Sequence, residues 1–218
     1  PCTTVQNVQR SYGNWTPRNA SKARYGQQVP LRWGLQQSNN WISAYLISLL
    51  GPSQFVNILH DFGLNNPDIE KNTSPVLCLG PSELSLGEMC SAYTTFINHG
   101  VRCAPLFVTR IEDSHGNVVA KFQPLMNEVI SEESSFKMLD MLQAVIQGGT
   151  GGRLRYNYNL TGEIGGKTGT TNNNSDGWFM GFTPQLVNGC WVGGEDRDIH
   201  FDSTAMGQGA TMALPIWA

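Results

Sequence analysis

The sequence predicts an α/β fold of the α+β type, in which a cluster of helices packs on an antiparallel sheet. Apolar residues recur at helical spacing through most of residues 1–160, and a polar turn between two β-rich runs marks a hairpin near 106–122. Residues 161–218 instead hold short β-rich runs separated by glycines. With 218 residues, 40% of them apolar and 14% charged, we expect one globular domain, or most of one.

The first fifty residues are expected to contain an irregular segment and two helices. Residues 1–30 mix glycines, prolines and polar residues with aromatic side chains, which favours an ordered loop. From 31 to 50, apolar residues recur at helical spacing, but Ser38, Asn39 and Asn40 interrupt the pattern. The sequence therefore predicts a helix, a short polar loop and a second helix.

Three more helices are predicted further along the chain. One covers 53–62, with Ser53 as its N-cap, and another covers 85–98 and ends before Gly100. The third begins at Ser131 and stops at 148–149. Its apolar stripe is expected to face the core and consists of Phe136, Leu139, Leu142 and Ile146.

The predicted strands are short and bounded by turns. Residues 106–111 and 118–122 flank a turn-forming run and predict a β-hairpin. In the last third, antiparallel strands are expected at 178–183 and 185–192, with a last helix or packed tail over 207–218. The glycine-rich turns that separate them are expected at 148–152, 165–169 and 193–194.

Charge and hydropathy exclude several classes of partner. The net charge is -3, and acidic and basic residues are scattered, so no nucleic-acid or anionic membrane surface is indicated. The most apolar stretch, 42–50, is far shorter than the ~20 residues of a membrane span. The chain opens at Pro1 without an initiator methionine or signal peptide, so we expect that an upstream part is missing.

No metal site or cofactor is expected. The five cysteines contain no C-x-x-C pair, which favours buried free thiols, although one disulfide stays possible and the compartment is undecided. Histidines without an acidic partner at metal or triad spacing are expected at the surface or in satisfied core positions. They are His60, His99, His115 and His200.

The sharpest chemical signal is Lys167-Thr168-Gly169-Thr170 at the start of the β-rich third. A strand that carries a cation, hydroxyl groups and a glycine can bind a carboxylate, and Gly169 lets a substrate backbone approach closely. The Lys-Thr-Gly tripeptide alone arises by chance in about one such chain in forty. Its context must therefore support a substrate-binding role.

That context resembles the serine penicillin-recognising enzymes, in which a Ser-x-Asn loop precedes a Lys-Thr-Gly strand. Residues 38–40 supply the first motif. The rest of the chain resembles the transpeptidase domain of bifunctional (class A) penicillin-binding proteins over nearly its whole length. The segments that carry this resemblance are 29–32, 86–89, 149–151 and 213–217.

The resemblance implies a role for each motif residue. Lys167 is expected to attract the substrate carboxylate and assist proton movement, while Thr168 and Thr170 hydrogen-bond that carboxylate. The backbone N–H of Thr170 is expected to be one oxyanion donor. Ser38 would relay a proton to the leaving amine, and Asn40 would hold the substrate amide. Because all three must reach the same scissile amide, Ser38, Asn40 and Lys167 are expected to converge on one cleft, within hydrogen-bonding distance or one water of each other. Two structural alternatives stay open, because Ser38 could simply cap a helix and Lys167 could be a solvated strand cation.

The sequence departs from the family pattern at the nucleophile. In the family, a Ser-x-x-Lys motif with the reactive serine precedes Ser-x-Asn, whereas the only literal match here, Ser134 to Lys137, lies between the two other motifs. We interpret Ser134 and Lys137 as ordinary first-turn residues of a helix, because a nucleophile needs a buried, electropositive site. The nucleophile is expected upstream of Pro1. The chain would then be a partial, N-terminally truncated domain that is inactive by itself.

The resemblance implies that the parent protein is a serine-type D-Ala-D-Ala transpeptidase of the bacterial cell wall. Its substrates would be peptidoglycan stem peptides, and β-lactams would be its inhibitors. A glycosyltransferase domain and a membrane anchor are expected upstream, which places the domain outside the cytoplasmic membrane. No metal or organic cofactor is implied.

Three other functions remain as alternatives. The chain could belong to a non-catalytic sensor or scaffold that binds penicillin or peptidoglycan without turnover. A β-lactamase shares the motifs but fits the intervening sequence less well. Residues 161–168 also approach the pattern of a phosphate-binding loop, but such a loop should open a helix, and 169–176 contains glycine and several asparagines.

Overall fold

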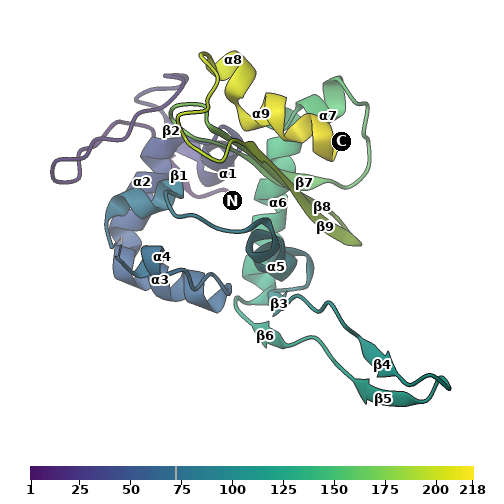
Figure 1. The fold of residues 1–218 in the computed structure, drawn as a ribbon. Coiled ribbons are helices and arrows are strands. Elements are labelled where there is room, and N and C mark those ends of the chain that lie inside the picture. The colour runs from purple at the N-terminus through teal and green to yellow at the C-terminus, as the bar shows by residue number, and fades with distance from the viewer. Residues whose placement is uncertain (72) are drawn as a thin grey trace.

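Two short strands close the N-terminal segment. In the computed structural model, which describes every residue except 72, β1 (Thr4–Gln6) pairs antiparallel with β2 (Gln28–Pro30) (Figure 1). The loop between them is irregular, as predicted, and the rings of Tyr12 and Trp15 lie 6.0 Å apart. The strand pair was not predicted, because strands of three residues leave almost no periodic signal.

A cluster of helices follows and surrounds its own apolar core. It consists of α1 (Leu31–Gln36), α2 (Asn40–Leu50), α3 (Pro52–Asp61), α4 (Pro67–Lys71), the 3-10 helix η1 (Pro75–Leu79) and α5 (Leu86–Ile97). The buried side chains of this core are Ile47, Val56, Leu64, Ile69, Leu77 and Ala92. The predicted helix, loop and helix over 31–50 are confirmed, and so is the helix over 85–98, which Ser85 caps.

The predicted cap of α3 is wrong. Ser53 lies inside the helix, whose N-cap is Gly51 and whose first residue is Pro52. Proline suits this position because its fixed φ matches the helix and its missing N–H has no helical partner there. Gly51 has φ +90°, a backbone conformation that a serine would adopt only with strain.

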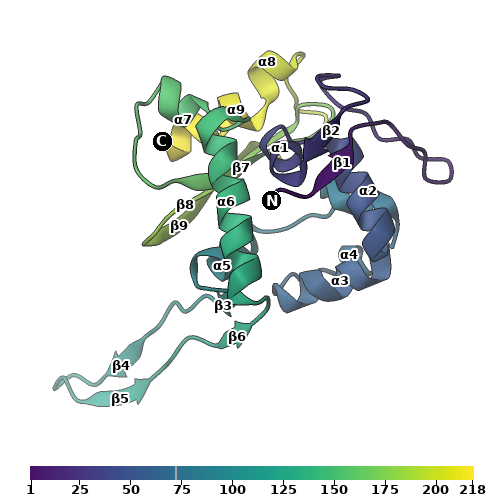
Figure 2. The ribbon, with the colours of Figure 1, turned by 180° about the vertical axis from the view of Figure 1, so that it is seen from behind.

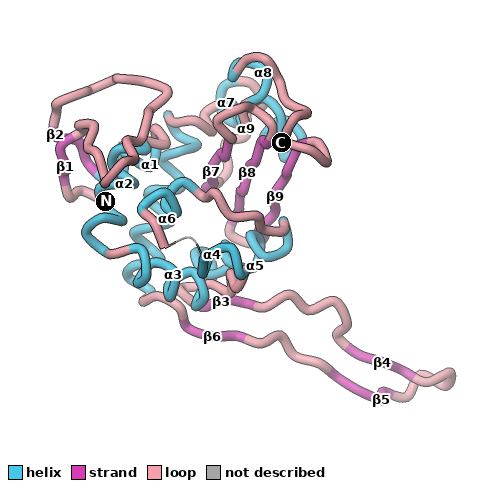
Figure 3. Tube along the Cα trace, turned by 60° about the vertical axis from the view of Figure 1, so that its left-hand side comes forward, coloured by secondary structure: helices cyan, strands magenta, loops and turns pink. Residues whose placement is uncertain are grey.

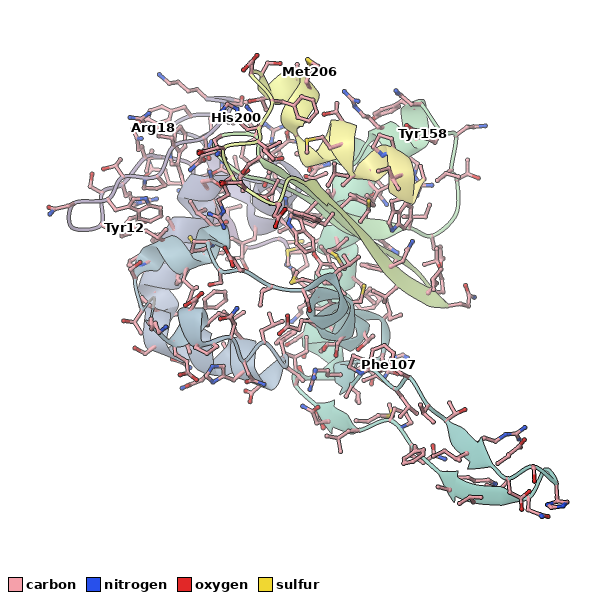
Figure 4. All side chains as sticks on the ribbon, in the orientation of Figure 1. Tyr12, Arg18, Phe107, Tyr158, His200 and Met206 are labelled. Carbon is pink, nitrogen blue, oxygen red and sulfur yellow. The ribbon has the colours of Figure 1, made fainter. Side chains whose placement is uncertain are left out.

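A two-stranded arm extends away from the body of the molecule (Figures 1 and 3). At its base β3 (Val101–Cys103) pairs with β6 (Met126–Glu128), and further out β4 (Arg110–Glu112) pairs with β5 (Val118–Lys121). The predicted hairpin is confirmed, although its strands are shorter than expected. Phe107, labelled in Figure 4 near the base of the arm, is 95% exposed.

The long helix α6 (Glu132–Gly148) runs from the base of the arm to the sheet (Figure 2). Its predicted start is confirmed, because Oγ of Ser131 accepts a hydrogen bond from the backbone N–H of Ser134. The predicted apolar stripe is wrong at Phe136, which is 72% exposed, whereas Ser135 is buried. A single exposed aromatic residue is ordinary on a protein surface, so its type does not reveal its face.

The sheet contains three antiparallel strands in the order β7-β8-β9. They are β7 (Gly165–Thr170), β8 (Asp176–Thr183) and β9 (Leu186–Gly193). The strands predicted at 178–183 and 185–192 are confirmed as β8 and β9, and the strand expected to carry Lys167-Thr168-Gly169 is confirmed as β7. The glycine-rich turn also predicted at 165–169 is therefore wrong. The glycines there allow close packing instead, since a Cβ on Gly166 would lie 2.5 Å from the carbonyl oxygen of Met180.

Helices at both ends of this region cover the sheet. The last turns of α6, the short α7 (Arg153–Tyr156) and the last of the C-terminal helices contribute to one buried cluster around Phe179. The C-terminal helices are α8 (Thr204–Gly207), α9 (Gly209–Met212) and α10 (Leu214–Trp217). The other buried members of the cluster are Val145, Ile146, Leu154, Ile164, Ala213 and Leu214. The observed architecture is therefore the predicted helical cluster packed on an antiparallel sheet.

The remaining sequence expectations have mixed outcomes. All five cysteines are free thiols, but Cys2 is exposed and the others are only partly buried. His99 and His60 do have acidic neighbours, Glu132 at 2.9 Å and Glu70 at 3.7 Å, which sequence spacing did not reveal. Among the described residues no group of three His, Cys, Asp or Glu could hold a metal ion.

Membrane-spanning potential is confined to one bent pair of helices. Among the described residues, no single helix is both long and apolar enough to cross a bilayer. In the described part of the chain, α2 and α3 are the only pair that together reach that length and composition, and they bend by 96° at their junction.

Candidate functional site

The loop between α1 and α2 presents Ser38. The backbone N–H of Ser38 donates to the carbonyl oxygen of Leu35, and Ser38 adopts φ +52°, in the left-handed region. The side chain of Asn39 accepts a hydrogen bond from the N–H of Ile42 and so caps α2. Since Asn39 and not Ser38 is the cap, the hydroxyl of Ser38 is free for another role.

Lys167 reaches this hydroxyl from the sheet. It lies in the middle of β7, and its Nζ donates to Oγ of Ser38 at 2.8 Å and to the carbonyl oxygen of Thr168 at 2.8 Å. The residues of this pair are 129 positions apart in the chain. The contact between Ser38 and Lys167 is the one that the sequence predicts, while the chemical roles of both residues stay predictions.

The surroundings of Lys167 change its acid–base behaviour. Burial lowers the pKa of Lys167 from 10.5 to about 8, because a desolvated ammonium group is less stable than one in water. At neutral pH the side chain is therefore mostly a cation, but it can lose its proton at moderate cost. A lysine in this state can both attract an anion and take part in proton transfer.

The same geometry argues against the phosphate-binding alternative. In a phosphate-binding loop the lysine lies where a loop enters a helix, and the helix N-terminus faces the phosphate. Here Gly165–Thr170 is a strand, and it continues through a tight turn into the next strand. Residues 161–168 therefore do not form such a loop.

Asn40 does not join the pair directly. Its Nδ2 donates to the carbonyl oxygen of Arg18 at 2.7 Å, and its backbone N–H donates to Oδ1 of Asn19 at 2.7 Å. Both partners belong to the N-terminal loop, on which Figure 4 labels Arg18. Asn40 thus lies two residues after Ser38, and its side-chain amide forms a hydrogen bond to that loop instead of to the pair.

The threonines of β7 point to the other side of the strand from Lys167, because side chains alternate along a strand. The hydroxyl of Thr168 donates to Oγ1 of Thr150 at 2.7 Å. Oγ1 of Thr170 accepts a hydrogen bond from the backbone N–H of Gly209 at 3.0 Å, which leaves its own hydrogen available to donate. Since β8 is the only strand that pairs with β7 among the described residues, the other edge of β7 is where the lysine and the threonines could contact one ligand.

Two residues of this site were not assigned a role from the sequence. Thr150 lies between α6 and α7 and holds the hydroxyl of Thr168. Gly209 opens α9 and packs directly on the β7–β8 hairpin, where a Cβ would lie 2.3 Å from the carbonyl oxygen of Gly169. The glycines that flank Thr150 were the only local signal, and nothing in the sequence connects either residue to β7.

The literal Ser-x-x-Lys match lies elsewhere and is exposed. Oγ of Ser134 accepts a hydrogen bond from Ser131, and Nζ of Lys137 forms an ion pair with Glu133 at 2.5 Å. Ser134 lies in the first turn of α6 and Lys137 in the second, and the 17 residues of that helix span about 25 Å. The last turn of α6, not the first, lies beside β7, so these residues are remote from Lys167 (Figure 2).

Comparison with known proteins agrees with this arrangement. A family model described as the penicillin binding protein transpeptidase domain matches residues 2–193. The chain belongs to this family. The resemblance to class A penicillin-binding proteins that the motifs indicate is thereby confirmed, because the most similar curated relatives include several proteins named penicillin-binding protein 1A.

The relatives are much longer than this chain. Penicillin-binding protein 1A of Aquifex aeolicus is 34% identical over 204 residues, which cover 94% of this chain and 27% of the relative. The protein of the same name from Neisseria lactamica is 31% identical over 214 residues, covering 93% and 25%. The chain spans about a quarter of the length of these relatives.

A solved structure shows the same fold. The crystal structure of penicillin-binding protein 1A from Haemophilus influenzae matches with a TM-score of 0.86 and 26% identity. The match covers 99% of this chain and 38% of that one. The predicted fold class, a helical cluster on an antiparallel sheet of the penicillin-binding transpeptidase type, is therefore confirmed.

Proposed function

We propose that this chain forms part of the active site of a serine-type D-Ala-D-Ala transpeptidase that cross-links peptidoglycan stem peptides. β-Lactams would bind at the same place as substrate analogues. The parent protein would act outside the cytoplasmic membrane, held by a membrane anchor and joined to a glycosyltransferase domain. The reactive serine of the Ser-x-x-Lys motif would belong to a part of the parent protein outside these 218 residues.

The hydrogen bond from Lys167 to Ser38 carries this proposal. A lysine ammonium group has donors only, so the Ser38 oxygen must be the acceptor, and the hydrogen of the Ser38 hydroxyl points elsewhere. That hydrogen is available to protonate the nitrogen that leaves when the acyl-enzyme forms. Lys167 can then return a proton to Ser38, which is the relay expected of a general acid in acyl transfer.

The other side of β7 supports recognition of a carboxylate. Both the D-Ala-D-Ala terminus and penicillins carry a carboxylate group. The hydroxyl of Thr170 accepts from Gly209 and so has its own hydrogen free to donate, and Lys167 supplies a positive charge nearby. A charge-assisted hydrogen bond of this kind is roughly twice as strong as a neutral one. Thr168 would join if its hydroxyl turned away from Thr150.

A cross-linking assay on the full-length protein tests the proposal. With a lipid-linked peptidoglycan precursor, the wild-type protein should release D-Ala and form cross-linked product, and penicillin should block both. Lys167→Ala should abolish cross-linking while polymerisation by a glycosyltransferase domain continues. If the wild-type protein binds penicillin covalently but releases no D-Ala, the sensor function replaces the transpeptidase.

A further inference from the structure

A buried hydrogen-bond network connects the N-terminal segment to the Ser38 loop. Asn7 is fully buried, and its Oδ1 accepts a hydrogen bond from Nδ2 of Asn39 at 2.9 Å. The Nδ2 of Asn7 donates to the carbonyl oxygens of Ala23 and Arg24, each at 3.0 Å. Both ends of the Asn7 amide thus have partners, and a fully satisfied buried amide holds its neighbours in one geometry.

Asn39 transmits this constraint to Ser38. It follows Ser38 directly, and its two side-chain atoms have different tasks. Oδ1 caps α2 by accepting from the N–H of Ile42 at 3.1 Å, while Nδ2 donates to Asn7. Its backbone N–H donates to the carbonyl oxygen of Gly34 at 2.9 Å. Asn39 cannot rotate without losing either the cap or the bond to Asn7.

The next two residues are held by the same segment, which we call the N-terminal brace (residues 7–24). Asn40 is hydrogen bonded to Arg18 and Asn19, and Nε1 of Trp41 donates to the carbonyl oxygen of Pro17 at 3.0 Å. The brace therefore contacts three consecutive residues after Ser38. These contacts join parts of the chain that lie 21 to 32 positions apart.

Ser38 needs such support because of its own backbone. A φ of +52° lies in the left-handed region and is strained for a non-glycine residue, so the surroundings must enforce it. A loop of three residues between α1 and α2 has few contacts of its own. The brace supplies the missing constraint from outside the loop.

We propose that Asn7 is a positioning residue for the Ser38–Lys167 pair: through Asn39 it holds the hydroxyl of Ser38 against the ammonium group of Lys167. Asn7 is buried and touches no substrate, so it acts only through Asn39. This inference rests on the proposed function and deepens it. It predicts that the brace affects the chemical step and not the affinity for penicillin.

Two variants remove the bond between Asn7 and Asn39 from opposite sides. Asn39→Ser keeps a helix cap, because serine is about as good an N-cap as asparagine, but its side chain is too short to reach Asn7. Asn7→Ala removes the acceptor and is the harsher change. If Asn7→Ala does not fold, Asn39→Ser still breaks the bond with the cap of α2 intact.

The measurement is acylation of the full-length protein by a fluorescent penicillin, with the maximal rate and the half-saturating concentration determined separately. Each variant should lower the maximal rate about tenfold and change the half-saturating concentration less than twofold. In a Ser38→Ala background neither variant should slow acylation further, because both act through Ser38. Full, multiplicative losses in that background would overturn the inference.

Ser135→Ala is the matched control for lost stability. Ser135 is buried like Asn7, and its hydroxyl donates to the carbonyl oxygen of Phe96 at 2.7 Å, in the first turns of α6. This control should lower the melting temperature but leave acylation unchanged. If Asn39→Ser slows acylation no more than Ser135→Ala does, the positioning role is wrong. If Ser38→Ala and Lys167→Ala also have no effect, the proposed function fails with it.

Discussion

The chain contains two pairs of serine and lysine, and they differ in almost every physical respect. Ser134 and Lys137 are three positions apart, match the nucleophile motif literally, and lie exposed at the start of α6, each bound to another neighbour. Ser38 and Lys167 match no single motif together and are 129 positions apart, yet they share a hydrogen bond of 2.8 Å. In the second pair, burial lowers the pKa of Lys167.

The difference shows which property makes such a pair chemically useful. On α6 the pair is fixed by helix geometry alone, and both side chains are exposed to solvent, which screens charge. At β7 the pair is assembled by two elements and a brace, and desolvation adjusts the proton affinity of the lysine. Closeness in the sequence is enough to match the motif, but packing is what brings Ser38 and Lys167 together and changes the proton affinity of the lysine.

The largest expected effect comes from Lys167→Ala in the full-length protein. It removes the charge that, in the proposed function, attracts the carboxylate, and it removes the donor of the hydrogen bond to Ser38. We expect the acylation rate constant with penicillin to fall by about 10³-fold or more, since general acid–base groups contribute about 10²–10⁴-fold. Gel fluorescence after timed incubation with a labelled penicillin measures this. A loss below tenfold would mean that Lys167 is only a solvated strand cation.

Ser38→Ala should have the next largest effect. It removes the proposed proton relay but leaves the cation, so we expect acylation to slow about 10²-fold. Ser38→Thr is the matched control, because it retains a hydroxyl that can accept from Lys167. Recovery of part of the rate in Ser38→Thr supports the relay. Equal losses in the two variants would instead point to the shape of the loop.

The pH dependence is expected to follow the pKa of Lys167. Raising the pH through about 8 removes the ammonium proton, so acylation should decline by about tenfold per pH unit above that value. The decline does not reflect unfolding. The folded-state pKa of Lys167 lies below the ordinary value of 10.5, so the unfolded chain binds more protons than the folded protein between about pH 8 and 10.5. The contribution of Lys167 to the free energy of unfolding therefore rises as the pH rises through this range.

Lys167→Arg provides the control for this titration. Arginine stays charged across this range, so the decline of the acylation rate above about pH 8 should disappear even if the overall rate is lower. A decline that persists unchanged in Lys167→Arg would assign the titration to another group.

The smallest effects are expected on α6. Ser134→Ala and Lys137→Ala should change acylation less than twofold and stability by less than about 0.5 kcal/mol, because both side chains are exposed. The 218-residue chain alone should form no covalent adduct with penicillin in intact-protein mass spectrometry. A stoichiometric adduct that Ser134→Ala abolishes would show that the literal motif is the nucleophile.

Much of the fold could be predicted from the sequence, because periodic patterns and caps are local. The helices on either side of Ser38 and the strands β8 and β9 follow from spacing alone. The Lys-Thr-Gly motif predicts the strand β7 that carries it, but the glycines of this segment also indicate a turn, because glycine marks turns more often than close packing. Their role depends on the neighbouring strand, which no local pattern reveals.

The site could be predicted only in part, for the same reason. The motifs indicated Ser38 and Lys167, and the structure brings them together. The partners Thr150, Gly209 and Asn7 contact the motif residues from 18 to 39 positions away along the chain. Contacts of this kind are set by packing, and their residue types are too common to signal them.

A double-mutant cycle between Ser38 and Lys167 tests the central claim most directly. Acylation rate constants for the full-length wild type, Ser38→Ala, Lys167→Ala and the double variant measure whether the two residues act as one unit. We expect the double variant to react no more than about threefold more slowly than Lys167→Ala alone, because each single change already breaks the relay. Two losses that multiply in full would show that Ser38 and Lys167 act independently, and would contradict the relay.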